Sequence, residues 1–204
     1  MKKRNGHKNE KGVEALLYQL LETELGGVEV YKTAIPCALN ADLREEWERY
    51  LSETRSHVQI ARDLLTEVGL DPDADVPARH VVRHIGESLV KAMELAREDG
   101  DADAAQLVAA ECVVHAETKD HMNWSLLGLM GRKTKGDAGK AMKQAAQKVE
   151  MQEDHHLYHT MGWTRELWIE SLGLPAALPP PEEEKNVQTA IGAARAKQSR
   201  DEML

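Results

Sequence analysis

The amino-acid sequence predicts an all-α protein built as a four-helix bundle, with one long crossover between the second and third bundle helices and further helices at the C-terminal end. Composition is the first reason: charged residues make up 30% of the 204 residues, aromatic residues only 4%, and phenylalanine is absent, which is typical of long helices in water. The second reason is that apolar residues recur every three to four positions through four long segments. The third is that short connections join the first pair and the last pair of these segments, as in antiparallel helix hairpins.

Each predicted helix has recognisable limits in the sequence. Pro36 is expected to kink or break the first helix near its end, because proline cannot continue the hydrogen-bonded ladder. Gly69 and the turn-rich stretch after it are expected to stop the second. The crossover contains a helix of its own. In chain order, the helices are expected over residues 12–39, 42–68, 78–98, 102–130 and 139–161.

The two ends of the chain are expected to differ from the bundle. Residues 1–11 are rich in lysine and arginine and predict a flexible basic N-terminus, and residues 12–163 form the bundle. Residues 164–204 are expected to hold a short helix with two tryptophans, an extended arm with the sequence LPPPEEE, and a helical tail at 186–200.

Charge and cysteine content exclude several classes of protein. The net charge of −9 argues against a nucleic-acid partner, because phosphate binding needs a basic surface. The chain has no apolar run long enough for a membrane span, and its basic start leads into an amphipathic segment instead of a signal peptide. Cys37 and Cys112 lie on different predicted helices and form no CxxC pair, so we expect reduced thiols in a cytoplasmic protein.

Acidic residues and histidines fall within the predicted apolar stripes of the four bundle helices. Placing residues at intervals of about 100° around each helix puts one glutamate near the middle of every stripe, and three stripes add a histidine within one turn. Glu46 and Glu150 lie less clearly at the stripe edges. The inward residues are Glu24 on the first helix, Glu53 and His57 on the second, Glu111 and His115 on the third, and Glu153 and His156 on the fourth.

The same geometry directs other candidates away from the interior. Glu117, Asp120 and His121 fall outside the third stripe, and Glu117 with His121 is expected to be an exposed pair. His155 and His159 are also expected to project elsewhere, although they lie in the stretch EDHHLYH beside His156.

Four inward carboxylates require compensation. A buried, unpaired carboxylate costs several kcal/mol, whereas a whole domain is stable by only about 5–15 kcal/mol. The predicted stripes contain no lysine or arginine, so the acids must be protonated or bound to metal. Two divalent cations would neutralise four carboxylates and use the imidazoles as ligands. A polar core without metal is the alternative.

The residues that carry this pattern resemble the ferritin-like superfamily of rubrerythrins, bacterioferritins and dimetal oxidases. That family has a glutamate on each of two bundle helices and a Glu-x-x-His motif on each of the other two. ELGGVEVY, with Tyr31 seven residues after Glu24, matches its first helix, EDHH matches its last, and Glu111 fills the remaining single-glutamate position. ETRSH departs from the pattern, since Glu53 and His57 are four residues apart, and His115 is an additional histidine.

The resemblance implies a pair of metal ions, iron or manganese or else zinc. Glu53 and either Glu111 or Glu153 would bridge them, Glu24 and one other glutamate would be terminal ligands, and His57 and His156 would each supply one nitrogen. His115 would be a third histidine ligand or support one of the others. Tyr31 would be either a hydrogen-bonded core residue or a redox-active neighbour of the metals.

The implied activity is that of an oxidoreductase acting with O₂ or peroxide, with an unknown organic substrate or electron donor, in a homodimer or larger homo-oligomer. The chain has no CxxC-type rubredoxin segment to supply electrons. Two other functions stay open. The same site could oxidise and store iron, or the protein could be a helical interaction protein without enzymatic activity that binds a partner through its C-terminal arm.

Overall fold

The computed structural model describes residues 2–181, with side chains described from residue 11 onward. Within this range the protein is all-α, as the sequence predicts. The predicted tail helix at 186–200 lies outside the described residues. The elements are α1 (Lys2–Ala34), the short 3₁₀ helix η1 (Ile35–Cys37), α2 (Ala41–Glu67), α3 (Pro77–Glu98), α4 (Ala102–Lys133) and α5 (Asp137–Ser171).

The helices end where the local sequence requires it. Pro36 lies in η1, directly after α1 ends, because proline lacks the N–H that a helix needs. Asn40 caps α2, and its side-chain oxygen accepts hydrogen bonds from the backbone N–H groups of Asp42 and Leu43. After α2, Gly69 adopts a φ of 82° and the N–H of Leu70 bonds to the carbonyl of Leu65, which is the Schellman type of helix end.

Two helices are longer than predicted. Residues 2–11, which precede the predicted start of the first helix, are the first turns of α1. Lysine, arginine and glutamate favour helix, and extending an existing helix is easier than starting one. The tryptophan-bearing segment is not a separate helix but the last part of α5. Its buried face runs on without a break through His156, Trp163 and Leu167, so the apolar stripe continues past Gly162.

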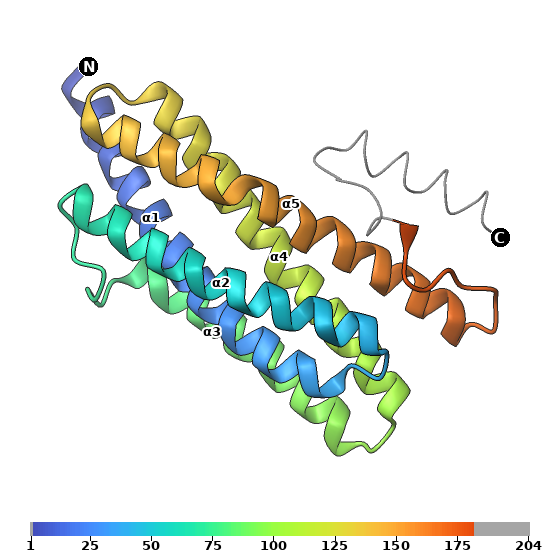
Figure 1. Cartoon of the computed structure of the whole chain (residues 1–204). Coiled ribbons are helices and arrows are strands. Elements are labelled where there is room, and N and C mark those ends of the chain that lie inside the picture. The colour runs from blue at the N-terminus through green and yellow to red at the C-terminus, as the bar shows by residue number, and fades with distance from the viewer. Residues whose placement is uncertain (1, 182–204) are drawn as a thin grey trace.

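Four of the helices surround a shared interior. α1 packs along α2 and α4, and α5 packs along the same two helices, so α1 and α5 face each other across the interior. The short connections make α1 with α2, and α4 with α5, antiparallel pairs (Figure 1). α3 is the helix of the long crossover and packs on the outside against α1 and α4.

An ion pair and a close crossing attach α3 to α1. The buried Glu22 carboxylate accepts hydrogen bonds from Arg79 Nε at 2.6 Å and from Arg83 Nε at 2.7 Å. At the crossing, a Cβ added to Gly86 would lie 3.5 Å from the Cα of Gly26, at van der Waals contact, so the two backbones pass close to each other. The crossover helix is therefore held in place by both charge and shape.

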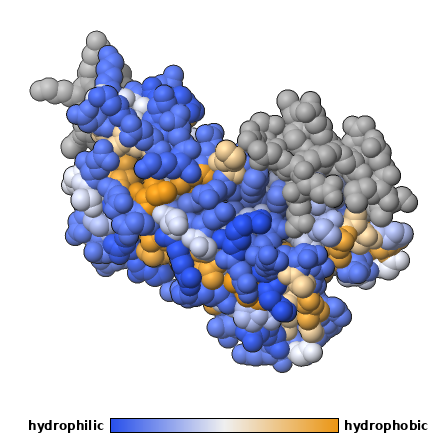
Figure 2. Space-filling view, in the orientation of Figure 1, coloured by the Kyte–Doolittle hydropathy of each residue, from blue (hydrophilic) through white to orange (hydrophobic). Residues whose placement is uncertain are grey.

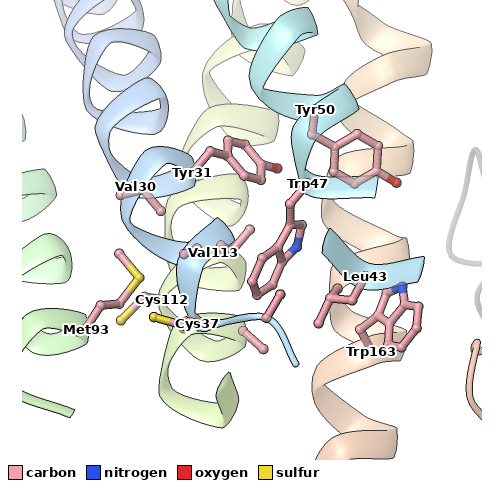
Figure 3. Close-up of a cluster of buried hydrophobic side chains, with 14 of the residues drawn as sticks. Val30, Tyr31, Cys37, Leu43, Trp47, Tyr50, Met93, Cys112, Val113 and Trp163 are labelled. Carbon is pink, nitrogen blue, oxygen red and sulfur yellow. The ribbon is translucent and has the colours of Figure 1, made fainter. Parts of the chain in front are cut away.

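The apolar core is divided into two clusters along the length of the helices. One contains Leu21, Leu65 and Trp124, and the other contains Tyr31, Trp47 and Trp163. Figure 3 shows the second cluster, in which the aromatic rings of α1, α2 and α5 meet. The outer face seen in Figure 2 is mostly hydrophilic, with hydrophobic residues in narrow strips. Buried polar residues occupy the level between the two clusters.

Candidate metal centre

The gap between the two apolar clusters is filled by acids and histidines from four helices. α1 contributes Glu24 and α2 contributes His57, both with no exposed surface. α4 contributes Glu117 and Asp120, and α5 contributes Glu153 and His156, all at most 5% exposed. The sequence positions explain this placement, because on each helix these residues lie between the segments that build the two apolar clusters.

His57, Glu153 and His156 form a first group of metal-ligand atoms. His57 Nδ1 lies 3.0 Å from Glu153 Oε1, and His156 Nδ1 lies 3.6 Å from the same oxygen. The two imidazole rings are stacked, with centroids 5.7 Å apart and an angle of 26° between their planes. One Glu117 oxygen also lies 3.6 Å from His156 Nδ1. Two nitrogens and at least one carboxylate oxygen therefore converge here.

Glu24, Asp120 and Glu153 form a second group. In each group the three ligand atoms lie within 4.8 Å of one another. Ligands bound about 2.0–2.2 Å from one ion lie at most about 4.4 Å apart, so small side-chain rotations would close either group around an ion. Glu153 belongs to both groups, so its carboxylate could contact an ion held in either one.

Most of these side chains are oriented by a second contact that leaves one ligand atom facing inward. Trp124 Nε1 donates to Glu24 Oε1 at 2.6 Å, and the Tyr31 hydroxyl donates to Glu117 Oε1 at 2.7 Å. In both carboxylates the other oxygen remains turned to the interior. Tyr31 is thus both a hydrogen-bonded core residue and an immediate neighbour of the cluster.

The histidines are held in the same manner. His57 Nε2 lies 2.9 Å from Gln152 Oε1, and His156 Nε2 lies 2.7 Å from Glu53 Oε2. Both partners are hydrogen-bond acceptors, so the Nε2 atoms carry protons and the Nδ1 atoms point inward. In the neutral form of each ring, Nδ1 holds the lone pair that a metal would bind. This arrangement is the usual support for a histidine that binds a metal through its other nitrogen.

The inward atoms have no hydrogen-bond partners. In the described part of the chain, ten buried side-chain nitrogen or oxygen atoms lack a partner, and seven of them lie in this cluster. Folded proteins pair nearly all buried polar groups, so such a concentration requires an explanation. The seven atoms are Glu24 Oε2, His57 Nδ1, Glu117 Oε2, Asp120 Oδ1, both carboxylate oxygens of Glu153, and His156 Nδ1.

Burial and mutual repulsion disturb the charges of the cluster. Burial, together with neighbouring carboxylates, raises the pKa values of Glu24 and Asp120 well above their usual range. Burial and then Glu117 raise the pKa of Glu153 to about 8. Burial lowers the pKa of His57. It has the same effect on His156, but Glu117 and Glu53 outweigh it and raise the pKa of this histidine to about 10. Without a cation, protons must therefore compensate the charge.

The donor set fits a divalent metal. Within the described residues, no lysine or arginine pairs with Glu24, Glu117, Asp120 or Glu153. The ion-pair neighbours of the three glutamates are the two histidines. Carboxylate and imidazole ligands suit iron, manganese and zinc. The buried histidine and carboxylate groups could thus hold a metal ion, and the four carboxylates would balance the charge of two.

The structure brings together five of the seven residues predicted as ligands: Glu24, Glu53, His57, Glu153 and His156. Glu53 was expected to bridge two metals, but its carboxylate lies on the outer nitrogen of His156, and its side chain is 25% exposed. It therefore orients His156 in this structure, while Glu153 takes the central position.

The other two predicted ligands lie away from the cluster. His115 is exposed, and Glu111 is half-buried and accepts a hydrogen bond from Trp168 Nε1 at 2.9 Å. The predicted inward face of this helix is therefore wrong. Glu117 and Asp120, expected to point outward, supply the acids of α4, and His121 bonds to Asp154 at 2.7 Å.

The size of the side chains on α4 explains this error. Six of its thirteen buried residues are alanine, cysteine or glycine, among them Ala105, Ala109 and Gly131, whereas Met122, Leu126 and Leu129 are more than 40% exposed. A Cβ on Gly131 would lie only 2.6 Å from the backbone nitrogen of Lys143 on α5. Close helix packing thus selects small residues, and a stripe drawn through the large apolar ones has the wrong direction. In the sequence, the true inward face of this helix is marked by Asn123 and Trp124, both buried, and by the small residues.

The remaining ambiguous residues can now be placed. Glu150 is exposed and lies outside the cluster. His155 is partly exposed, but the prediction that His159 points away from the interior is wrong, because this histidine is 4% exposed and its Nδ1 lies 3.1 Å from Glu46 Oε1. Glu46 also accepts hydrogen bonds from Tyr50 and Trp163. It belongs to a separate polar group, one level away from the metal-ligand atoms.

This geometry gives a prediction for the two displaced residues. Glu111→Ala and His115→Ala are each expected to leave the metal content of the protein unchanged, because neither side chain reaches the cluster. Elemental mass spectrometry of the purified variants, beside the parent protein, measures this directly. Loss of metal from either variant would show that α4 presents a different face in solution.

No match was found between this chain and protein-family models, characterised proteins or solved structures. Among residues 2–181, none of the helices combines the length and apolar character that crossing a membrane requires.

Proposed function

We propose that this protein is a ferritin-like four-helix bundle that holds two divalent metal ions, iron or manganese, and acts as an oxidoreductase with O₂ or peroxide. The observation that carries the proposal is the set of seven unpartnered atoms, all metal-ligand types, at the level between the two apolar clusters. The order of inward residues supports it as well. Each of the four surrounding helices contributes one or two inward residues, and α5 carries the Glu-x-x-His motif of the ferritin-like pattern. The set departs from that pattern on α2, which supplies His57 alone, and on α4, which supplies two acids.

In this proposal each residue has a defined role. His57, His156 and Glu153 hold one ion, and Glu24, Asp120 and Glu153 hold the other. Glu117 stands beside the first group, where its inward oxygen is a further ligand. Tyr31, Trp124, Gln152 and Glu53 fix the orientation of the ligands by hydrogen bonds.

Two bound iron or manganese ions would supply the electrons and the open coordination positions for reaction with O₂ or peroxide. The chain itself provides three things. It excludes bulk water, since the ligands have almost no exposed surface. It keeps the imidazole lone pairs directed inward through the hydrogen bonds at Nε2. It also places a proton donor, the Tyr31 hydroxyl, on a carboxylate of the centre.

The function is tested by loading the chelator-treated protein with Fe²⁺ under anaerobic conditions and then adding O₂ or hydrogen peroxide. The loaded protein is expected to consume the oxidant faster than the same concentration of free Fe²⁺. Repeated turnover with an added reductant would support an oxidoreductase, whereas accumulation of ferric iron well beyond two ions per chain would favour iron storage. The variant Glu150→Gln, which removes an exposed acid one turn before Glu153, should consume the oxidant as fast as the parent protein. Consumption no faster than that of free Fe²⁺ would contradict the proposal.

A further inference from the structure

The two groups that share Glu153 offer different ligand atoms. The first, called here the histidine position, has the Nδ1 atoms of His57 and His156 and a Glu153 oxygen. The second, called the carboxylate position, has oxygens of Glu24, Asp120 and Glu153. Both imidazoles thus lie on one side of the centre, whereas the ferritin-like pattern alone implies one histidine for each ion.

The difference matters because divalent metals discriminate between such donors. Imidazole suits zinc, copper, iron and nickel, whereas an all-oxygen set suits manganese, magnesium and calcium. The histidine position is also better prepared for an ion. Its two rings are stacked and each is held at its outer nitrogen, by Gln152 and Glu53 respectively. Ligands already held in the bound orientation bind more tightly, because less freedom is lost on binding.

Charge makes the two binding steps unequal. Glu117 stands 3.6 Å from His156 Nδ1 and adds a second carboxylate to the histidine position. An ion bound there would therefore meet two nitrogens and two acids. A second ion would then enter beside a cation already bound, with Glu153 shared between them, so its attraction to the remaining acids is partly offset.

We propose that the two metal positions are unequal: the histidine position fills first and tightly, and the carboxylate position binds more weakly and prefers a harder ion such as Mn²⁺. This inference rests on the proposed two-metal centre and extends it, since a centre with unequal positions can hold two different metals. Asp120 belongs to the carboxylate position alone, and His57 and His156 belong to the histidine position alone. Glu24 borders both positions, because its Oε1 also lies 3.6 Å from His57 Nδ1.

The test is a sequential titration of the full, chelator-treated chain. One equivalent of Zn²⁺ is added first, and Mn²⁺ is then titrated while the electron paramagnetic resonance signal of free Mn²⁺ reports its binding. The zinc-loaded protein is expected to bind one further Mn²⁺ per chain. In a parallel titration with Zn²⁺ alone, the second Zn²⁺ is expected to bind with a Kd at least about tenfold higher than that of the first.

Two variants show which metal position each binding step belongs to. Asp120→Asn is expected to weaken Mn²⁺ uptake by about tenfold or more and to leave the first Zn²⁺ nearly unchanged, whereas His57→Gln is expected to weaken the first Zn²⁺ by a similar factor. Glu150→Gln should change neither, and circular dichroism of each variant checks that the helices are intact.

Two zinc ions bound in a single phase of equal affinity would overturn this inference and leave the two-metal proposal standing. The same holds if Asp120→Asn weakens both phases equally. Uptake of neither metal would overturn both proposals.

Discussion

Glu153→Gln is expected to remove most of the bound metal from this protein, more than any other single change of one functional group. Its carboxylate is the only one that belongs to both groups of ligand atoms, and both of its oxygens are buried without a hydrogen-bond partner. Changes to residues that merely support a ligand weaken metal binding by about 10–100-fold. Loss of the shared ligand should therefore weaken metal binding at both positions by about 100-fold or more.

The measurement is metal content after reconstitution and desalting, for Glu153→Gln beside the parent protein and Glu150→Gln. The control keeps the same charge change on the same helix, one turn away, at an exposed position. If Glu153→Gln retains the same metal per chain as the control, the carboxylate does not bridge two ions and the assignment of the groups is wrong.

Removal of metal is expected to destabilise the parent protein, and Glu153→Gln is expected to stabilise the metal-free form. Burial, and then repulsion by Glu117, raise the pKa of Glu153 to about 8 in the folded chain, against about 4.3 in an unfolded one. An acid with a raised folded pKa costs stability once it must ionise, so the metal-free protein should lose stability as the pH rises from about 4 to about 8. Glutamine does not ionise, and its amide can donate to the neighbouring carboxylates.

Thermal unfolding of chelator-treated protein at pH 5.5 and pH 8 tests this reasoning. The parent should have the lower Tm at pH 8, and Glu153→Gln should show a smaller difference between the two pH values. Adding metal at a hundredfold excess over its Kd should raise the free energy of unfolding of the parent by about 2.7 kcal/mol for each site. The same metal concentration should leave the stability of the variant unchanged. A metal-free variant less stable than the metal-free parent at pH 8 would contradict the account of charge repulsion in the cluster.

The fold could be predicted from the sequence wherever apolar periodicity and helix-ending residues agree. Pro36 and Gly69 end their helices as expected, and the crossover helix begins within one residue of its predicted start. The extension of α5 through Gly162 could not be seen locally, because glycine lowers helix propensity and only packing of Trp163 against the core shows that the helix continues.

The cluster itself was only partly predictable. On α1, α2 and α5 large apolar residues surround the polar ligands, so the direction of the stripe and of Glu24, His57, Glu153 and His156 could be inferred from the sequence. On α4 much of the interior face is alanine and glycine, which carry little hydrophobic signal although they allow close helix contact. For this reason the sequence pattern points to Glu111 and not to Asp120.

The role of a residue was harder to predict than its direction. Glu53 does point toward the cluster, but only its hydrogen bond to the outer nitrogen of His156 reveals that it supports a ligand in this structure. In the same way, the hydrogen bond from Tyr31 to Glu117 joins residues 86 positions apart in the chain. Such contacts depend on how two helices are rotated against each other, which the periodicity of one helix does not contain.

The most direct test of the central claim is the number of metal ions per chain in the untagged protein, purified without chelator and measured by elemental mass spectrometry. A tag would add histidines and obscure the result. The account predicts close to two ions per chain, with iron or manganese present, and their loss in Glu153→Gln. A chain that carries no metal, and that takes up neither Fe²⁺ nor Mn²⁺ when these are added under anaerobic conditions, would contradict it.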